Sequence, residues 1–72
     1  MAAEPTQVCL DLHDALERLT ALHERRGRVV ELRFFGGLTH EEAAEVLDVS
    51  RKTAEADWTF ARAWLRRELE RA

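Results

Sequence analysis

The sequence predicts an all-α fold, a small four-helix domain, on the strength of two observations. Apolar residues recur at steps of three and four residues in four segments, the spacing that gives a helix one apolar face. No segment shows the alternation of apolar and polar residues that is typical of a half-buried strand. A chain of 72 residues has room for one small core. We expect a flexible leader over residues 1–9 and one helical domain over residues 10–72.

The first predicted helix runs from about Asp11 to His23. Asp11 is a suitable N-cap, because its carboxylate can accept hydrogen bonds from the free amides of a first turn. Pro5 and the scarcity of large apolar side chains before Asp11 support the leader. The apolar stripe of this helix consists of four leucines: Leu12, Leu16, Leu19 and Leu22.

The second predicted helix runs from about Arg25 to Phe35 and stops at the pair Gly36-Gly37. Phe34 and Phe35 are adjacent, so both rings cannot point to the same side of a helix. We expect one ring to be buried and the other to be partly exposed toward a partner. The other apolar residues expected inside are Val29, Val30 and Leu32.

The third predicted helix opens with the strongest local signal in the chain, Thr39-His40-Glu41-Glu42. This is a capping box, in which the Thr39 hydroxyl caps the Glu42 amide and the Glu42 carboxylate reaches back to Thr39. The helix is expected to end near Asp48. Its inner face is expected to hold Ala43, Ala44, Val46 and Leu47.

The fourth predicted helix follows a short turn, with Ser50 as its cap, and runs to about Arg71. We expect Trp58 and Trp64 to belong to the core, or one of them to a partner surface, and neither to stack on bases. The inner stripe of this helix recurs at steps of four, three, four and four residues: Ala54, Trp58, Ala61, Leu65 and Leu69.

The third and fourth helices together predict a helix-turn-helix unit. Ala44 supplies the small residue needed where the two helices approach each other. Asp48 occupies the turn position that often requires left-handed backbone, where glycine is the usual residue and aspartate is tolerated. The first turn of the fourth helix, residues 50–53, presents hydroxyls and cations at a helix N-terminus, which suits DNA phosphates and the major groove.

The candidate DNA contacts are concentrated in that first turn. Arg51 and Lys52 lead, because the start of a recognition helix enters the groove first. Glu55 can accept a hydrogen bond from cytosine N4, whereas Thr39 is chiefly a cap that could also touch a phosphate. The competing interpretation of each is a solvated helix face or cap. The full set of candidates is Arg51, Lys52, Thr53, Glu55, Thr39, Arg62 and Arg66.

The net charge of −3 argues at first against nucleic acid, whose binding proteins are usually basic. The charge is unevenly distributed, however. Before residue 51, five arginines face ten acidic side chains, and from residue 51 onward six cations face four acids. The distribution therefore removes the objection to DNA and indicates weak DNA binding by the domain alone.

The sequence offers no support for several other classes of protein. There is no nucleophile–base pair and no glycine-rich phosphate loop, so we expect no enzyme and no cofactor. Cys9 and the three histidines lack metal-ligand spacing, so we expect no metal. A lone cysteine cannot form an internal disulfide, which fits a reducing cytoplasm. No apolar run approaches the ~20 residues needed to cross a bilayer.

The run Val29–Leu47, with Leu-Arg-Phe-Phe-Gly-Gly-Leu at residues 32–38, resembles region 4 of the bacterial RNA polymerase sigma-70 family, closest to the extracytoplasmic-function (ECF) subgroup. Asp48–Trp58 is similar to its recognition-helix segment and Phe60–Leu69 to the helix that follows. The resemblance spans about residues 10–70. It implies recognition of the minus-35 promoter element, contact with the β flap of RNA polymerase, masking by anti-sigma proteins, and a location in the bacterial cytoplasm at the nucleoid.

The resemblance has departures. Ala54 stands where the family usually has a β-branched residue, and Glu55 and Ala56 stand where it usually has a basic one. Region 2, which melts the promoter, has no counterpart in these residues, so the sequence fits either a fragment or a stand-alone region 4-like protein.

Two alternative functions remain open on the sequence. One is a protein-interaction module of the same fold, which turns its acidic third helix and Glu55 toward the polymerase flap or an anti-sigma protein and has little DNA affinity. The other is a LuxR-type helix-turn-helix regulator. Such domains dimerise through a fourth helix, whereas here the C-terminal stretch merges into one long helix.

Overall fold

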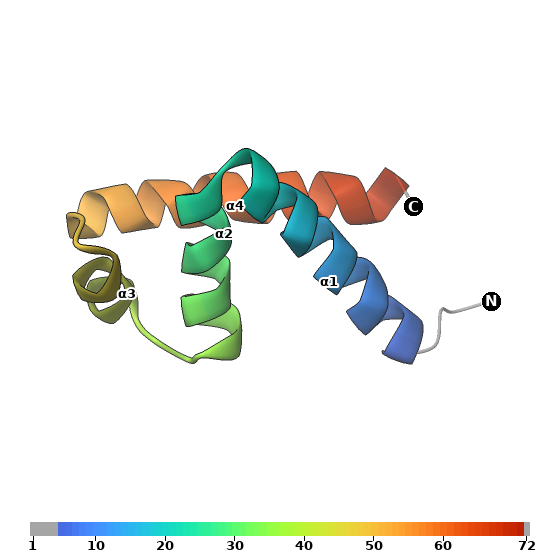
Figure 1. Ribbon diagram of the computed structural model, residues 1–72, viewed down its shortest axis with the longest axis horizontal. Coiled ribbons are helices and arrows are strands. Elements are labelled where there is room, and N and C mark those ends of the chain that lie inside the picture. The colour runs from blue at the N-terminus through green and yellow to red at the C-terminus, as the bar shows by residue number, and fades with distance from the viewer. Residues whose placement is uncertain (1–4, 72) are drawn as a thin grey trace.

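The computed structural model describes residues 5–71, and within these residues the chain forms four α-helices and no strand. The all-α prediction is confirmed. The longest helix, α4, runs along the length of the molecule, α1 and α2 cross it, and α3 lies beside its start (Figure 1). The helices are α1 (Pro5–Leu22), α2 (Glu24–Val30), α3 (His40–Leu47) and α4 (Arg51–Arg71), and a π-helical turn, η1 (Glu31–Phe35), continues α2.

Helix α1 begins earlier than predicted, at Pro5. Proline suits a first helical position because the amide hydrogen that it lacks has no partner there. Asp11 consequently lies inside the helix, and its prediction as N-cap is wrong. Of the residues assigned to the leader, 5–9 belong to the backbone of α1 and 1–4 lie outside the described residues. The last predicted leucine of the stripe, Leu22, is 65% exposed because the helix ends there.

The second helix stops where the sequence predicts. The Gly36 amide donates to the Glu31 carbonyl at 2.9 Å, and Gly37 follows with a left-handed φ of 70°. The prediction that one of the two phenylalanines is buried is wrong, since Phe34 and Phe35 are both 61% exposed. Their rings pack edge to face on each other, with centroids 5.1 Å apart, instead of dividing between core and surface.

The core lies where α1 and α2 cross α4. The predicted stripe of α4 is confirmed, with Ala54, Ala61 and Leu65 buried and its other two members half-buried. Trp58 and Trp64 both pack against the core as expected. The buried residues of this core cluster are Ala15, Leu16, Leu19, Val30, Ala61 and Leu65.

The inner face of α3 is narrower than predicted. Ala43 and Ala44 are buried and Leu47 is half-buried, but Val46 is mostly exposed. The prediction for Val46 is wrong because its side chain lies roughly 100° around the helix from the centre of the face that the other three residues form.

Candidate nucleic-acid interface

The start of α3 is fixed by the predicted capping box. Thr39 Oγ1 accepts from the Glu42 amide at 3.1 Å, and Glu42 Oε1 accepts from the Thr39 amide at 3.0 Å. The end of α3 is fixed by Asp48, whose backbone is left-handed with φ 55° and ψ 48°. The Val49 amide then donates to the Ala44 carbonyl at 3.0 Å. Both ends of α3 therefore match the local rules on which the helix-turn-helix prediction rests.

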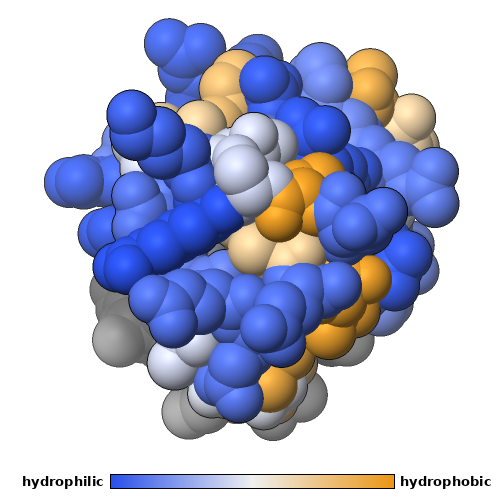
Figure 2. Space-filling model, turned by 90° about the vertical axis from the view of Figure 1, so that its left-hand side faces the viewer, coloured by the Kyte–Doolittle hydropathy of each residue, from blue (hydrophilic) through white to orange (hydrophobic). Residues whose placement is uncertain are grey.

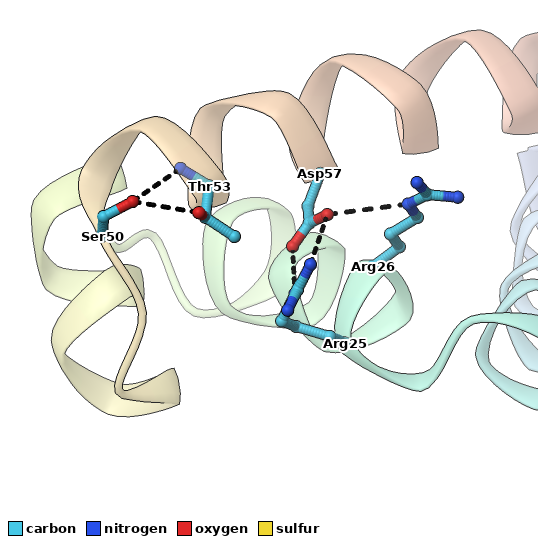
Figure 3. Close-up of polar contacts among 5 residues, drawn as sticks. All are labelled: Arg25, Arg26, Ser50, Thr53 and Asp57. Atoms are coloured by element: carbon cyan, nitrogen blue, oxygen red, sulfur yellow. Dashed lines mark hydrogen bonds and ion pairs between the residues drawn. The ribbon is translucent and has the colours of Figure 1, made fainter.

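The start of α4 is capped by Ser50, as predicted. Its Oγ accepts from the Thr53 amide at 3.1 Å, and the Ser50 hydroxyl donates to Thr53 Oγ1 at 2.9 Å (Figure 3). The side chain of Thr53 is thus held against the cap and is half-buried. Its own hydroxyl hydrogen remains available for one further acceptor.

Arg51 bridges the two helices. Its Nε donates to Glu55 Oε1 at 2.9 Å, and its Nη1 donates to Glu41 Oε1 at 2.8 Å. All three side chains are well exposed, at 60% for Arg51, 42% for Glu55 and 69% for Glu41. Sequence spacing could have found the pair of Arg51 with Glu55, which are four residues apart on one helix. It could not have found Glu41, which depends on how α3 meets α4.

The candidate DNA contacts fall into two groups, one around the start of α4 and one farther along this helix. Thr39 and Arg51 line one shallow hollow beside α3, together with Arg33 and His40. The side chain of Lys52 is exposed and forms no hydrogen bond or ion pair within residues 5–71. This end of the molecule presents a mostly hydrophilic surface with smaller hydrophobic areas between the polar side chains (Figure 2). The structure thus brings the cap of α3 and the first turn of α4 onto one polar surface.

Arg62 and Arg66 lie farther along α4, about 16 and 22 Å beyond Arg51 at the rise of an α-helix. Arg66 Nε donates to Glu70 Oε1 at 3.2 Å, and the Arg62 guanidinium lies 6.0 Å from the centre of the Trp58 ring. Both side chains border a groove between α1, η1 and α4. The apolar residues that line this groove are Leu12, Val30, Phe34, Trp58, Leu65 and Leu69.

An ion pair that was not predicted from the sequence ties α2 to α4 through a buried carboxylate. The Asp57 side chain is only 4% exposed and accepts from Arg25 Nε at 2.5 Å and from Arg25 Nη2 at 3.3 Å (Figure 3). Arg26 Nε lies 3.6 Å from Asp57 Oδ1, the oxygen that also accepts from Arg25 Nη2, and its guanidinium packs 3.7 Å from the centre of the Phe60 ring. The hydrogen bond to Asp57, and the charge of Asp57, raise the pKa of Arg25 above its ordinary value. We call these three charged residues the Asp57 clamp.

A signal for the Asp57 clamp was present in the sequence. Asp57 lies three residues after Ala54 and four before Ala61, on the inner side of α4. A carboxylate in that position needs a cationic partner, because an unpaired charge is costly to bury.

The described part of the chain offers nothing to hold a metal: no three histidine, cysteine, aspartate or glutamate side chains come together as ligands. None of the helices in residues 5–71 is long and apolar enough to cross a membrane.

Comparison with known proteins identifies the family. The family model described as ECF sigma factor matches residues 1–71. No curated protein and no solved structure gives a match. Sigma factors are transcription regulators, not enzymes, and act at promoter DNA with RNA polymerase during initiation. The resemblance seen in the sequence is thereby confirmed at the level of the family, and the chain belongs to the ECF sigma factor family.

Proposed function

We propose that this chain acts as region 4 of an ECF-type sigma factor and recognises the minus-35 promoter element with the α3–turn–α4 unit. The observation that carries the proposal is the polar surface at the start of α4. There Arg51 and Lys52 emerge from a capped first turn, directly after a left-handed turn that follows the capped helix α3. Membership in the sigma family favours this function over that of a LuxR-type regulator.

The first turn of α4 suits the major groove in both size and chemistry. A helix with its side chains is about 10–12 Å wide, and the major groove is about 12 Å wide. Arg51 offers hydrogen-bond donors for a guanine edge, and the unpaired Lys52 offers a charge for a phosphate. Thr53 and Glu55 lie in the same part of α4. In the proposed complex, Thr39 at the capped start of α3 would face the DNA backbone.

Arg62 and Arg66 are proposed as weaker phosphate contacts. Positions 51, 55, 62 and 66 fall on one side of a helix with 3.6 residues per turn, so both arginines face the same side of α4 as Arg51. Their distance along the helix takes them beyond the groove that the first turn would occupy. Their contribution to DNA affinity should therefore be smaller than that of Arg51.

Selection from a pool of duplexes with a randomised centre tests the DNA-binding proposal. The 72-residue chain, at low salt, should enrich a short common sequence, and its affinity should fall with rising salt as phosphates release counterions. A pool that shows no enrichment, together with tight binding of the chain to RNA polymerase, would favour the alternative of a protein-interaction module.

The polymerase contact is proposed for the apolar groove between α1, η1 and α4, where an apolar segment of the β flap would bind. Phe34 and Phe35 provide a matched test, because both are 61% exposed but only Phe34 lines the groove. Phe34→Ser should weaken binding of the chain to RNA polymerase core about tenfold, and Phe35→Ser should change it little. Equal losses in the two variants would contradict the use of this groove.

An anti-sigma protein that masks the chain would compete for the same two surfaces. Competition between such a protein and RNA polymerase for the unmodified chain, weakened in Phe34→Ser, would support masking at the groove. A protein that acts with RNA polymerase on promoter DNA works at the nucleoid, so we propose the bacterial cytoplasm as its location.

A further inference from the structure

Arg51 is held from two sides before any DNA is present. Glu41 contacts its guanidinium from α3 and Glu55 contacts it from α4, at 2.8 and 2.9 Å. We propose that Glu41 and Glu55 are positioning residues, which make Arg51 a reader of a base edge in place of a general phosphate contact. This inference rests on the proposed function and assigns a specificity role to two carboxylates on the DNA-facing surface.

The remaining hydrogen-bond donors of Arg51 are sufficient for a base. A guanidinium carries five N–H groups, of which the Nε–H is directed to Glu55 and one Nη1–H to Glu41. Three remain, and reading guanine through O6 and N7 uses two. Because the two glutamates belong to different helices, they favour one orientation of the guanidinium plane as well as one position.

Arg51, Glu41 and Glu55 together form what we call the Arg51 trio. Its net charge disfavours contact with a phosphate more than contact with a base edge. One arginine and two glutamates sum to −1, so a phosphate that approaches Arg51 meets two carboxylates beside the cation. A guanine edge carries no net charge and meets the same donors with much less repulsion. The glutamates should therefore weaken binding to DNA of any sequence more than they weaken binding to the correct sequence, which raises the ratio between the two affinities.

The exposure of the trio supports a role outside folding. Ion pairs between exposed side chains contribute little to stability, because water competes for both partners. Glu55 in this assignment acts through Arg51 and need not touch a base itself. Glu41, an acidic residue of α3, then contributes to the discrimination between DNA sequences.

The test compares Glu41→Gln and Glu55→Gln in the 72-residue chain. The probes are the duplex enriched from the randomised pool and a scrambled duplex of the same composition, each measured over a range of salt. Each variant should bind the scrambled duplex about threefold more tightly, lower the ratio of the two affinities by a similar factor, and steepen the salt dependence. Thermal unfolding should be almost unchanged in both variants.

Two controls test whether the glutamates act through Arg51. Glu45→Gln removes the same charge from the same helix as Glu41→Gln, and the Glu45 side chain has no hydrogen bond or ion pair with Arg51 among residues 5–71. It should leave the affinity ratio unchanged. In an Arg51→Ala background, adding Glu55→Gln should have no further effect on the ratio, because the glutamate would have nothing left to position.

Three results would overturn the inference: an unchanged ratio in both glutamine variants, the same change in Glu45→Gln, or a full effect of Glu55→Gln without Arg51. The proposed function fails separately. If the unmodified chain binds selected and scrambled duplexes equally, recognition of a sequence is wrong and the inference falls with it. If the unmodified chain discriminates and the variants discriminate equally well, only the inference is wrong.

Discussion

Glu55 and Asp57, two positions apart on α4, each belong to an arginine–carboxylate cluster of similar chemistry. In the Asp57 clamp, Arg25 Nε donates to a carboxylate that is 4% exposed, and in the trio around Arg51 the same kind of atom donates to Glu55, which is 42% exposed. Water can replace the partners of Glu55 but not those of Asp57. Burial, rather than hydrogen-bond geometry, thus assigns the first cluster to the fold and leaves the second available for a ligand.

The largest difference between the two clusters is expected when each carboxylate is neutralised in turn. Asp57→Asn should lower the free energy of unfolding by about 2 kcal/mol, because the buried charge-assisted hydrogen bonds are lost. For a domain of this size, the melting temperature should fall by on the order of 10 °C. Glu55→Gln is the matched exposed change and should stay within about 0.5 kcal/mol of the unmodified chain. Similar losses in the two variants, in urea or thermal unfolding, would remove the distinction.

The helix that supplies Arg25 and Arg26 is itself held by close packing at Gly27. A Cβ placed on Gly27 would lie 2.0 Å from Thr20 Oγ1 and 2.8 Å from the Thr20 Cα, so α1 and α2 would have to move apart. We expect Gly27→Ala to destabilise the chain by about 1–2 kcal/mol, measured by urea unfolding. Alanine is the better helix former, so a gain in stability would show that the helices can separate without cost.

Substitutions in the exposed cluster around Arg51 should change the affinity for DNA rather than the free energy of unfolding. Arg51→Ala should weaken binding to the selected duplex about tenfold, with the loss concentrated at one base pair, while unfolding changes little. Arg28→Ala is the control, since Arg28 is an exposed arginine on α2 whose side chain has no ion pair or hydrogen bond in the described residues. A loss of stability without a loss of affinity in Arg51→Ala would place Arg51 with the Asp57 clamp.

The smallest effect is expected at Lys52, the neighbour without carboxylate partners in residues 5–71. Lys52→Ala should weaken binding about threefold on all duplex sequences and reduce the slope of affinity against salt by about one phosphate contact. Titrations of selected and scrambled duplexes would measure both quantities. A loss confined to one base pair would mean that Lys52, and not Arg51, reads the base.

The elements that local rules determine could be predicted from the sequence. The capping box at Thr39, the left-handed Asp48 and the stop at Gly36-Gly37 each depend on a few consecutive residues, and the structure confirms all three. The misses at Asp57 and Arg51 depend on contacts between distant segments. Neither the partners of Asp57 on α2 nor Glu41 beside Arg51 can be derived from spacing within one helix.

The two phenylalanines illustrate the same limit. Helical periodicity requires that Phe34 and Phe35 diverge, but it does not require that either direction lead into a core. Because η1 extends beyond the crossing with α4, both rings remain at the surface, one beside the groove and one outside it. Their different neighbours follow only from the packing of α1, η1 and α4.

The continuous α4, 21 residues long, connects the polar surface at its start to the groove beyond its middle. In the proposed complex, the length of α4 would set the separation of promoter and polymerase at about 1.5 Å per residue and their relative rotation at about 100° per residue. A single inserted residue between the two surfaces would change the spacing only slightly but turn one surface far out of phase with the other. The length of this helix is therefore expected to tolerate less change than most of its exposed side chains.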